Sequence, residues 1–194
     1  MIITHHREKL INAIVYFARH TKKCGKTKLM KLLYFLDFMH FKQTGKSVTG
    51  LEYYAWKRGP VPRDLFSEIS NGMSEDLNKA IAVAPTEIGD DKIFHKIFAN
   101  PQQKFDDKHF TKREIRLLEM TAEIFRNADS EQMIMASHLK NDPWDRTITE
   151  KGKLTKIDYM LAIDGTPDSL SYEDALEKKQ DREHMYRVFG TVEA

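Results

Sequence analysis

The most hydrophobic stretch of the chain lies between Thr27 and Gly45. Its apolar residues, read with a helical period, cover almost the whole circumference. They leave a thin polar seam, which consists of Lys28, Lys31, Asp37, His40 and Lys42. A helix that is apolar nearly all round is buried by its neighbours, and this one is too short and too often interrupted by charge to cross a membrane. The pattern predicts a buried central helix, capped by Thr27 and ended at Gly45 in the left-handed conformation.

A short aromatic segment follows, in which the period changes from helical to alternating. Residues 53–56 read Tyr-Tyr-Ala-Trp, and Gly59 and Pro60 come shortly after them. Aromatic residues favour strands, and a Gly-Pro pair favours a turn. Residues 92–98 are also rich in strand-forming side chains. We expect the two segments to pair in a small antiparallel sheet.

Amphipathic or capped segments predict further helices around the central one. They lie at residues 5–20, 62–71, 74–83, 111–128, 130–139, 155–163 and 171–188. The clearest start signal is Thr111 followed by Glu114, which is the spacing of a capping box. The predicted fold is therefore mainly α (α+β), a buried central helix ringed by other helices, with a small antiparallel β-sheet. We expect one domain over residues 1–194, in which residues 167–194 form a charged C-terminal helical extension.

Four short motifs occur in an order that resembles a known family. Their residues are Lys28, Leu29, Lys31, Leu32, Leu33, Tyr34 and Phe35, then Gly45, then Ala55, Trp56, Gly59, Pro60 and Val61, and finally His138, Pro143 and Trp144. Together they resemble the Panacea domain, the SocA-like antitoxin domain of bacterial and phage toxin–antitoxin systems, over residues 8 to 150.

This resemblance implies a mostly helical protein that binds and neutralises a cognate toxin, encoded beside it, by direct protein–protein contact. It also implies that such a protein can act as a proteolysis adaptor, which delivers its toxin to a protease. The matched motifs look like determinants of the fold. The resemblance therefore assigns none of their residues as a toxin contact.

Cysteine usage and the N-terminal residues indicate the compartment. The single cysteine, Cys24, excludes an intramolecular disulfide and is typical of a reducing cytosol. The N-terminus has no apolar run before its charges, which argues against a secretory signal. We expect a cytoplasmic protein without a membrane partner.

The net charge of +2 conceals an uneven distribution. Residues 1–63 hold 13 Lys and Arg against 3 Asp and Glu, a net charge of +10, whereas residues 64–194 have a net charge of −8. Two interpretations stay open. The two parts neutralise each other across the fold, or the basic part forms a face for an acidic partner or nucleic acid.

No catalytic motif occurs in the sequence. Gly25-Lys26-Thr27 has the last residues of a phosphate-binding loop but lacks the earlier glycine and the preceding apolar strand. The histidines are scattered, at His5, His6, His20, His40, His95, His109, His138 and His184. With a single cysteine and no tight pair of ligands beyond His5 and His6, a structural zinc site is not expected. We predict a protein that is not an enzyme and has no cofactor and no metal.

Two pairs of polar residues have structural interpretations. His40 lies one helical turn after Asp37, which predicts a hydrogen-bonded pair in the core. Ser137 and His138 are neighbours on a predicted helix, so they point in different directions and cannot form a nucleophile–base pair by themselves. We expect His138 to hydrogen-bond to the loop at residues 143–144.

The aromatic and basic residues after the central helix are the candidates for binding. Alternate residues of a strand share a face, so Tyr54 and Trp56 lie on one side, and Tyr53 and Ala55 on the other with Lys57. Large aromatic residues beside arginine are typical of protein interfaces, and they also stack on single-stranded nucleic acid. We interpret Trp56 as a core residue. The predicted partner-binding residues are Tyr53, Tyr54, Lys57, Arg58 and Arg63.

The sequence therefore leaves three functions open. The first is an antitoxin, which rests on the resemblance, on the missing catalytic residues and on the charge distribution. The alternative is a nucleic-acid-binding regulator or phage-associated protein that uses the basic N-terminal third, whose binding would weaken steeply with salt. The third, a small enzyme, needs a pocket assembled from dispersed residues.

Overall fold

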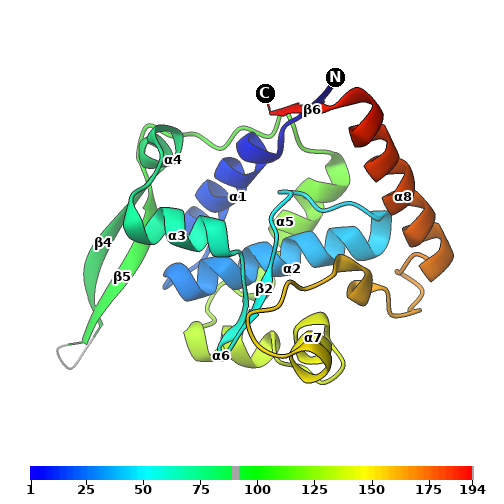
Figure 1. Cartoon of the computed structure of the whole chain (residues 1–194). Helices are drawn as coiled ribbons and strands as arrows, with labels where there is room; N and C mark the ends of the chain where they lie inside the picture. Colours follow the sequence, from blue (N-terminus) through cyan, green and yellow to red (C-terminus); the bar gives the residue numbers. More distant parts are fainter. Residues whose placement is uncertain (89–91, 194) are drawn as a thin grey trace.

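One helix lies at the centre of the fold, as the hydrophobic pattern predicts. The structure is a computed structural model that describes residues 1–88 and 92–193. Helix α2 (Lys26–Thr44) runs through the middle of the molecule (Figure 1), and 12 of its 19 residues are buried. It ends at Gly45, whose φ of 73° is left-handed, and the Gly45 N–H donates to the carbonyl of Phe41. The predicted end of the central helix is confirmed.

The start of α2 differs from the prediction. Gly25, not Thr27, is the N-cap, and no side chain caps the helix. Gly25 is extended and forms an isolated bridge with Lys96, so the chain enters the helix directly after it. A Cβ at position 25 would lie 2.5 Å from the ring of Phe94, which explains the glycine. Thr27 therefore already belongs to the first turn.

Other helices surround α2 and confirm the mainly α fold. They are α1 (His6–His20), α3 (Arg63–Asn71), α4 (Glu75–Ala80), α5 (Lys112–Ile124), α6 (Ser130–Ala136), α7 (Pro143–Lys151), the 3-10 helix η1 (Tyr159–Ala162) and α8 (Tyr172–Phe189). The rings of Phe35 on α2 and Phe125 at the end of α5 stack with their centroids 4.8 Å apart. The capping box of Thr111 and Glu114 is present as predicted.

The strands form three separate pairs, so the predicted sheet is wrong in its pairing. Strand β2 (Tyr54–Trp56) pairs antiparallel with β3 (Gly59–Val61), and β4 (Ile81–Ile88) pairs antiparallel with β5 (Lys92–Ala99). β1 (Ile2–Thr4) pairs in parallel with β6 (Thr191–Glu193). In both antiparallel pairs each strand takes the partner nearest in sequence, because a short hairpin closes the smallest loop. The segment at 92–98 is thus a strand, but it does not pair with the aromatic segment.

The C-terminal helix lies along the edge of the molecule. Figure 1 shows α8 beside the body that surrounds α2, with the two chain termini close together at β1 and β6. Ala175 is its one fully buried residue. Within the described residues, no helix is both long and apolar enough to cross a membrane.

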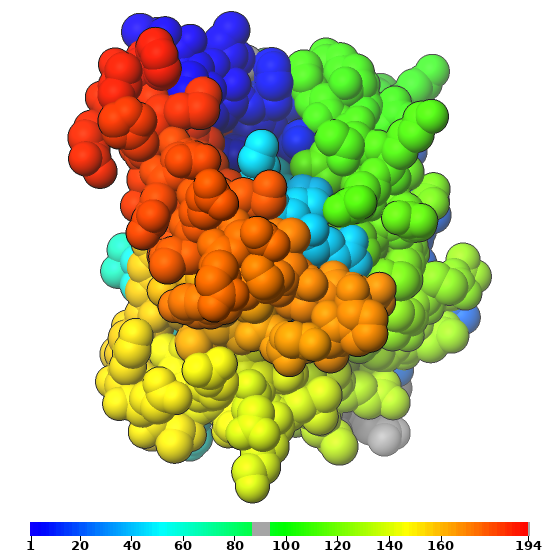
Figure 2. Space-filling model, turned by 90° about the vertical axis from the view of Figure 1, so that its right-hand side faces the viewer, coloured from blue at the N-terminus to red at the C-terminus, as the bar shows by residue number. Residues whose placement is uncertain are grey.

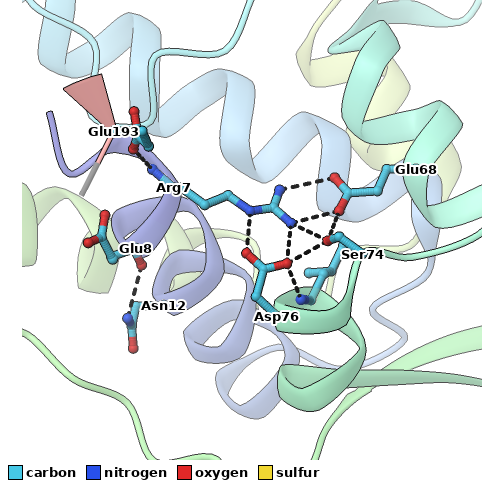
Figure 3. A network of polar contacts seen from close by, with 8 residues as sticks. Arg7, Glu8, Asn12, Glu68, Ser74, Asp76 and Glu193 are labelled. Atoms are coloured by element: carbon cyan, nitrogen blue, oxygen red, sulfur yellow. Dashed lines mark hydrogen bonds and ion pairs between the residues drawn. The ribbon is translucent and has the colours of Figure 1, made fainter. Parts of the chain in front are cut away.

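An arginine joins the start of α1 to α3 and α4 (Figure 3). The Arg7 guanidinium donates to Glu68 at 2.6 and 3.0 Å, to both oxygens of Asp76 at 2.8 Å, and to the hydroxyl of Ser74. The backbone N–H of Arg7 donates to the carboxylate of Glu193, which follows α8. The hydrogen bonds from Arg7 hold the pKa of Asp76 well below its usual range. One side chain thus connects elements that lie far apart in the sequence.

The Arg7→Gln variant is expected to lose about 2 kcal/mol of unfolding free energy at pH 7, because two carboxylates lose a partly buried cation. A carboxyl whose folded pKa is lowered contributes stability above its unfolded pKa of about 4, and this contribution is lost as the pH falls. The difference from the wild type should therefore shrink at pH 3. Urea denaturation at both pH values measures it. The matched control is Arg116→Gln on the exposed face of α5, and equal losses in the two variants would contradict the prediction.

Candidate partner-binding surface

The β2–β3 hairpin has one face in the core and one face at the surface. Tyr53 and Ala55 are fully buried, whereas Tyr54 and Trp56 are partly exposed. The alternation predicted from the sequence therefore holds. Trp56 is not a core residue, because its ring lies at the surface side of the hairpin against α3.

The outward side chains of the hairpin join those of two helices. Trp56 meets Phe66 of α3 edge to face, with the ring centroids 5.1 Å apart. The ammonium of Lys26 lies 5.4 Å from the centre of the Phe66 ring, and the guanidinium of Arg63 lies 4.7 Å from that of Tyr54. We name this aromatic and basic surface the hairpin face; its residues are Lys26, Tyr54, Trp56, Arg63 and Phe66.

The predicted binding residues fall in different places. Tyr54 and Arg63 lie on the hairpin face, and Lys57 and Arg58 are exposed at the turn beside it, where Arg58 pairs with Glu131. Tyr53 does not lie on the surface. It is fully buried and its hydroxyl donates to Asp37 at 2.8 Å, so its burial excludes it from this face.

Phe66 and Lys26 were not among the predicted binding residues. Phe66 belongs to a predicted helix, whereas Lys26 lies before the predicted start of the central helix. The approach of both to the hairpin depends on how α3 and the start of α2 pack. The signal that could have indicated Phe66 is its position three residues after Arg63. On a helix that spacing places two side chains on one face.

A buried lysine supports the hairpin from behind. Lys31 is 1% exposed, and its ammonium donates to the carbonyl of Pro60 at 2.7 Å. Burial lowers the pKa of Lys31 to about 7. Gly59 has a φ of 102°, and a Cβ there would lie 2.7 Å from the Lys31 Nζ and 2.8 Å from the Ser137 hydroxyl. Only glycine fits at this position, in both backbone angle and space.

The last of the four sequence motifs, which contains His138 and Trp144, contacts the same hairpin. The indole N–H of Trp144 donates to the carbonyl of Trp56 at 2.9 Å. His138 stacks on the Trp144 ring with centroids 3.7 Å apart, and its Nε2 is buried without a hydrogen-bond partner among the described residues. The predicted hydrogen bond from His138 to this loop is wrong, because the contact is made through the ring face. Burial lowers the pKa of His138, which favours the neutral ring.

Asp37 and His40 do not form the expected pair. The Asp37 carboxylate accepts from the backbone N–H groups of Val48 and Thr49, from the Thr49 hydroxyl and from Tyr53. His40 instead contacts the carbonyl of Lys46 through Nδ1, at 2.7 Å. Burial raises the pKa of Asp37, and its four hydrogen bonds oppose that shift. Both residues thus hold the loop that leads from α2 to the hairpin.

Charges from the two parts of the chain meet in ion pairs. Arg7 pairs with Glu68 and Asp76, Lys9 with Glu114, Lys42 with Asp164, and Arg58 with Glu131. Two further lysines of the basic part, Lys28 and Lys31, are buried. These contacts favour the interpretation that the basic and acidic parts neutralise each other within the fold. They leave less of the basic third free to contact nucleic acid.

One group of side chains resembles a set of metal ligands, although no metal was predicted. His5, Glu8 and His109 bring one potential ligand atom each to within 4.8 Å of one another. The rings of His5 and His109 stack nearly parallel, at 3.9 Å. A metal lies close to the plane of each imidazole that binds it, so parallel stacked rings do not direct their nitrogens at one ion. We therefore interpret this group as packing between α1 and the segment before α5.

Comparison with known proteins gives one match. The family model described as antitoxin SocA-like, Panacea domain, matches residues 29–145, which extend from α2 into α7 and include the whole hairpin. No curated protein and no solved structure matches the chain.

Proposed function

Because this chain belongs to the SocA-like antitoxin family with a Panacea domain, we propose that it neutralises a cognate toxin by direct contact through the hairpin face. Membership supports a role in a toxin–antitoxin pair and a toxin as partner. We further propose that the chain acts by binding and not by catalysis.

The observation that supports this surface is the way the family motifs converge behind it. Lys31, Gly59 and Trp144 lie within the matched region, and each contacts or borders the backbone of the hairpin. Their contacts hold the strand that carries Tyr54 and Trp56. Tryptophan, tyrosine and arginine are the residues that most often dominate binding energy, and a rigid support reduces the entropy lost on binding.

Co-expression tests the function directly. Each open reading frame beside this gene is induced alone and together with this chain, and cell growth is measured. We expect one neighbour to be toxic alone, to be tolerated with this chain, and to co-purify with it. Rescue without co-purification would indicate indirect control, and the absence of any toxic neighbour would reject the proposal. The level of the toxin during rescue separates neutralisation by binding alone from delivery to a protease.

Substitutions on the hairpin face test the surface. Arg63→Glu and Tyr54→Ala are each expected to weaken toxin binding about 30-fold, the effect of losing roughly 2 kcal/mol at an interface hot spot. Titration calorimetry of the purified pair measures the Kd. The matched controls are Arg187→Glu and Tyr172→Ala, which make the same changes at exposed positions of α8. If the controls weaken binding as much as the hairpin variants, the hairpin face is not the interface.

A further inference from the structure

A cleft lies between α8 and the body of the protein. Its walls come from α8, from the N-terminal residues with α1, and from the start of α5, and its floor from the end of α2 and the loop after it. Its volume is about 980 Å³. Figure 2 shows it as a hollow beside the orange and red atoms of α8, with the cyan loop atoms at its floor. This volume is at the upper end of the range for small-molecule pockets, about 300–1,000 Å³.

The cleft has more positive than negative charge. Lys9 is neutralised by Glu114, at 2.7 Å. Four further cations line the cleft and form no ion pair within residues 1–88 and 92–193: Lys46, Arg113, Lys178 and Arg182. Asp181 is the one carboxylate of the lining, apart from Glu114, that could offset them. Among the lining side chains the balance is therefore about three positive units, which the Glu193 carboxylate beside His6 reduces further, and the remaining positive charge attracts an anion.

One of these cations has an unfilled donor. The Nη1 of Arg182 is buried and has no hydrogen-bond partner among the described residues. A buried guanidinium nitrogen without an acceptor is costly, and a ligand oxygen in the cleft would remove that cost. The two histidines of the lining contribute no lasting charge near pH 7, because burial lowers the pKa of both His6 and His40.

The walls also offer apolar contact. Phe41, Tyr159 and Tyr186 line the cleft together with Met185. Arginine guanidinium groups match the geometry of phosphate oxygens, and aromatic rings suit a flat organic group. The cleft is bounded by α8, α1 and α5, and its volume is in the range that suits a compact ligand.

We propose that the cleft between α8 and the body binds a small phosphate-bearing molecule, whose phosphate groups lie between Arg182 and Lys178 of α8 and Lys46 and Arg113 of the body. The proposal does not depend on the antitoxin role. Lys178 and Arg182 lie outside the region that the family model matches, so the site is complete only with this chain's C-terminal helix. A ligand held from both sides would fix α8 against the body.

Titration calorimetry on the full chain tests the proposal, with sodium pyrophosphate, ATP and adenosine as probes. We expect ATP and pyrophosphate to bind with a stoichiometry near one, and adenosine not to bind. Tighter binding of ATP than of pyrophosphate would assign an organic phosphate as the ligand. Equal binding would restrict the site to the phosphate groups, and no binding of either at millimolar concentration would overturn the proposal.

Charge substitutions distinguish a site from general attraction to a basic protein. Arg182→Gln and Arg113→Gln are each expected to weaken ATP binding at least tenfold. Arg187→Gln removes the same charge from an exposed position on α8 outside the cleft lining and should change the Kd less than twofold. Equal weakening by all three, or none by Arg182→Gln in a variant with an unchanged melting temperature, would reject the site. Toxin rescue by the same variants shows separately whether the antitoxin role survives.

Discussion

Replacing Asp37 with alanine is expected to lower the free energy of unfolding by about 4 kcal/mol, the range reached when a buried hydrogen-bond network is broken. Asp37 is fully buried on α2. Its Oδ1 accepts from the N–H groups of Val48 and Thr49, both at 2.8 Å, and its Oδ2 accepts from Tyr53 at 2.8 Å and from the Thr49 hydroxyl. Alanine leaves two buried backbone N–H groups without an acceptor, at about 1–3 kcal/mol each.

Asparagine is the matched control at the same position. Its amide oxygen can still accept from Val48 and Thr49, while the hydroxyls of Thr49 and Tyr53 can turn to accept from the amide nitrogen. We expect Asp37→Asn to lose about half as much stability as Asp37→Ala. Guanidinium denaturation at pH 7, followed by circular dichroism, measures both. A loss below about 1 kcal/mol in the alanine variant would show that water or a rearranged loop replaces the carboxylate.

The central helix could be predicted because its pattern is local. The apolar circumference and Gly45 are properties of consecutive residues, and the structure confirms both. The polar residues of this helix could also be identified from the sequence, but their hydrogen-bond partners could not. Lys28 donates to the carbonyls of Lys22, Arg126 and Ala128, and two of these belong to a segment about 100 positions away. A backbone carbonyl has no sequence signature, because every residue has one.

The errors in pairing have a related cause. Periodicity indicates that a segment is a strand, but not which strand lies beside it. Residues 92–98 were predicted as a strand, and the partner that they have, β4, lies directly before them. The alternation of Tyr54 and Trp56 could be predicted for the same local reason as the helix. The spacing of Arg63 and Phe66 places both on one face of α3, but the packing of that face against Trp56 has no local signature.

Replacing Lys31 with methionine is expected to remove a rise in stability between pH 7 and pH 10. Burial lowers the folded pKa of Lys31 to about 7, whereas an unfolded lysine titrates near 10.4. Between these values the unfolded state binds more protons, so the wild type gains stability as the pH rises. The gain is about 4 kcal/mol over the full interval. Below pH 7 the lysine is charged in both states, and its contribution is constant.

Urea denaturation of the wild type and Lys31→Met at pH 6, 7, 8 and 9 measures the difference between them. Other groups titrate in this range, and burial raises the pKa of Cys24 to about 11. Their effects are common to both proteins and cancel in the difference. Methionine fills a similar volume without charge, although it leaves the carbonyl of Pro60 without its donor. The exposed Lys57→Met is the matched control and should follow the wild type at every pH.

The way the stability difference between the wild type and Lys31→Met changes with pH shows whether the Lys31 amine is charged or neutral. If Lys31 is neutral above pH 7, the free energy of unfolding of the wild type increases relative to that of Lys31→Met by about 1 kcal/mol for each pH unit between 7 and 9. A constant difference would mean that Lys31 stays protonated in the folded protein. Its single hydrogen bond to Pro60 would then have to offset a buried charge, and one neutral acceptor does not do this without water or a carboxylate nearby. The pH dependence thus tests whether the family motif supports the hairpin through a neutral amine.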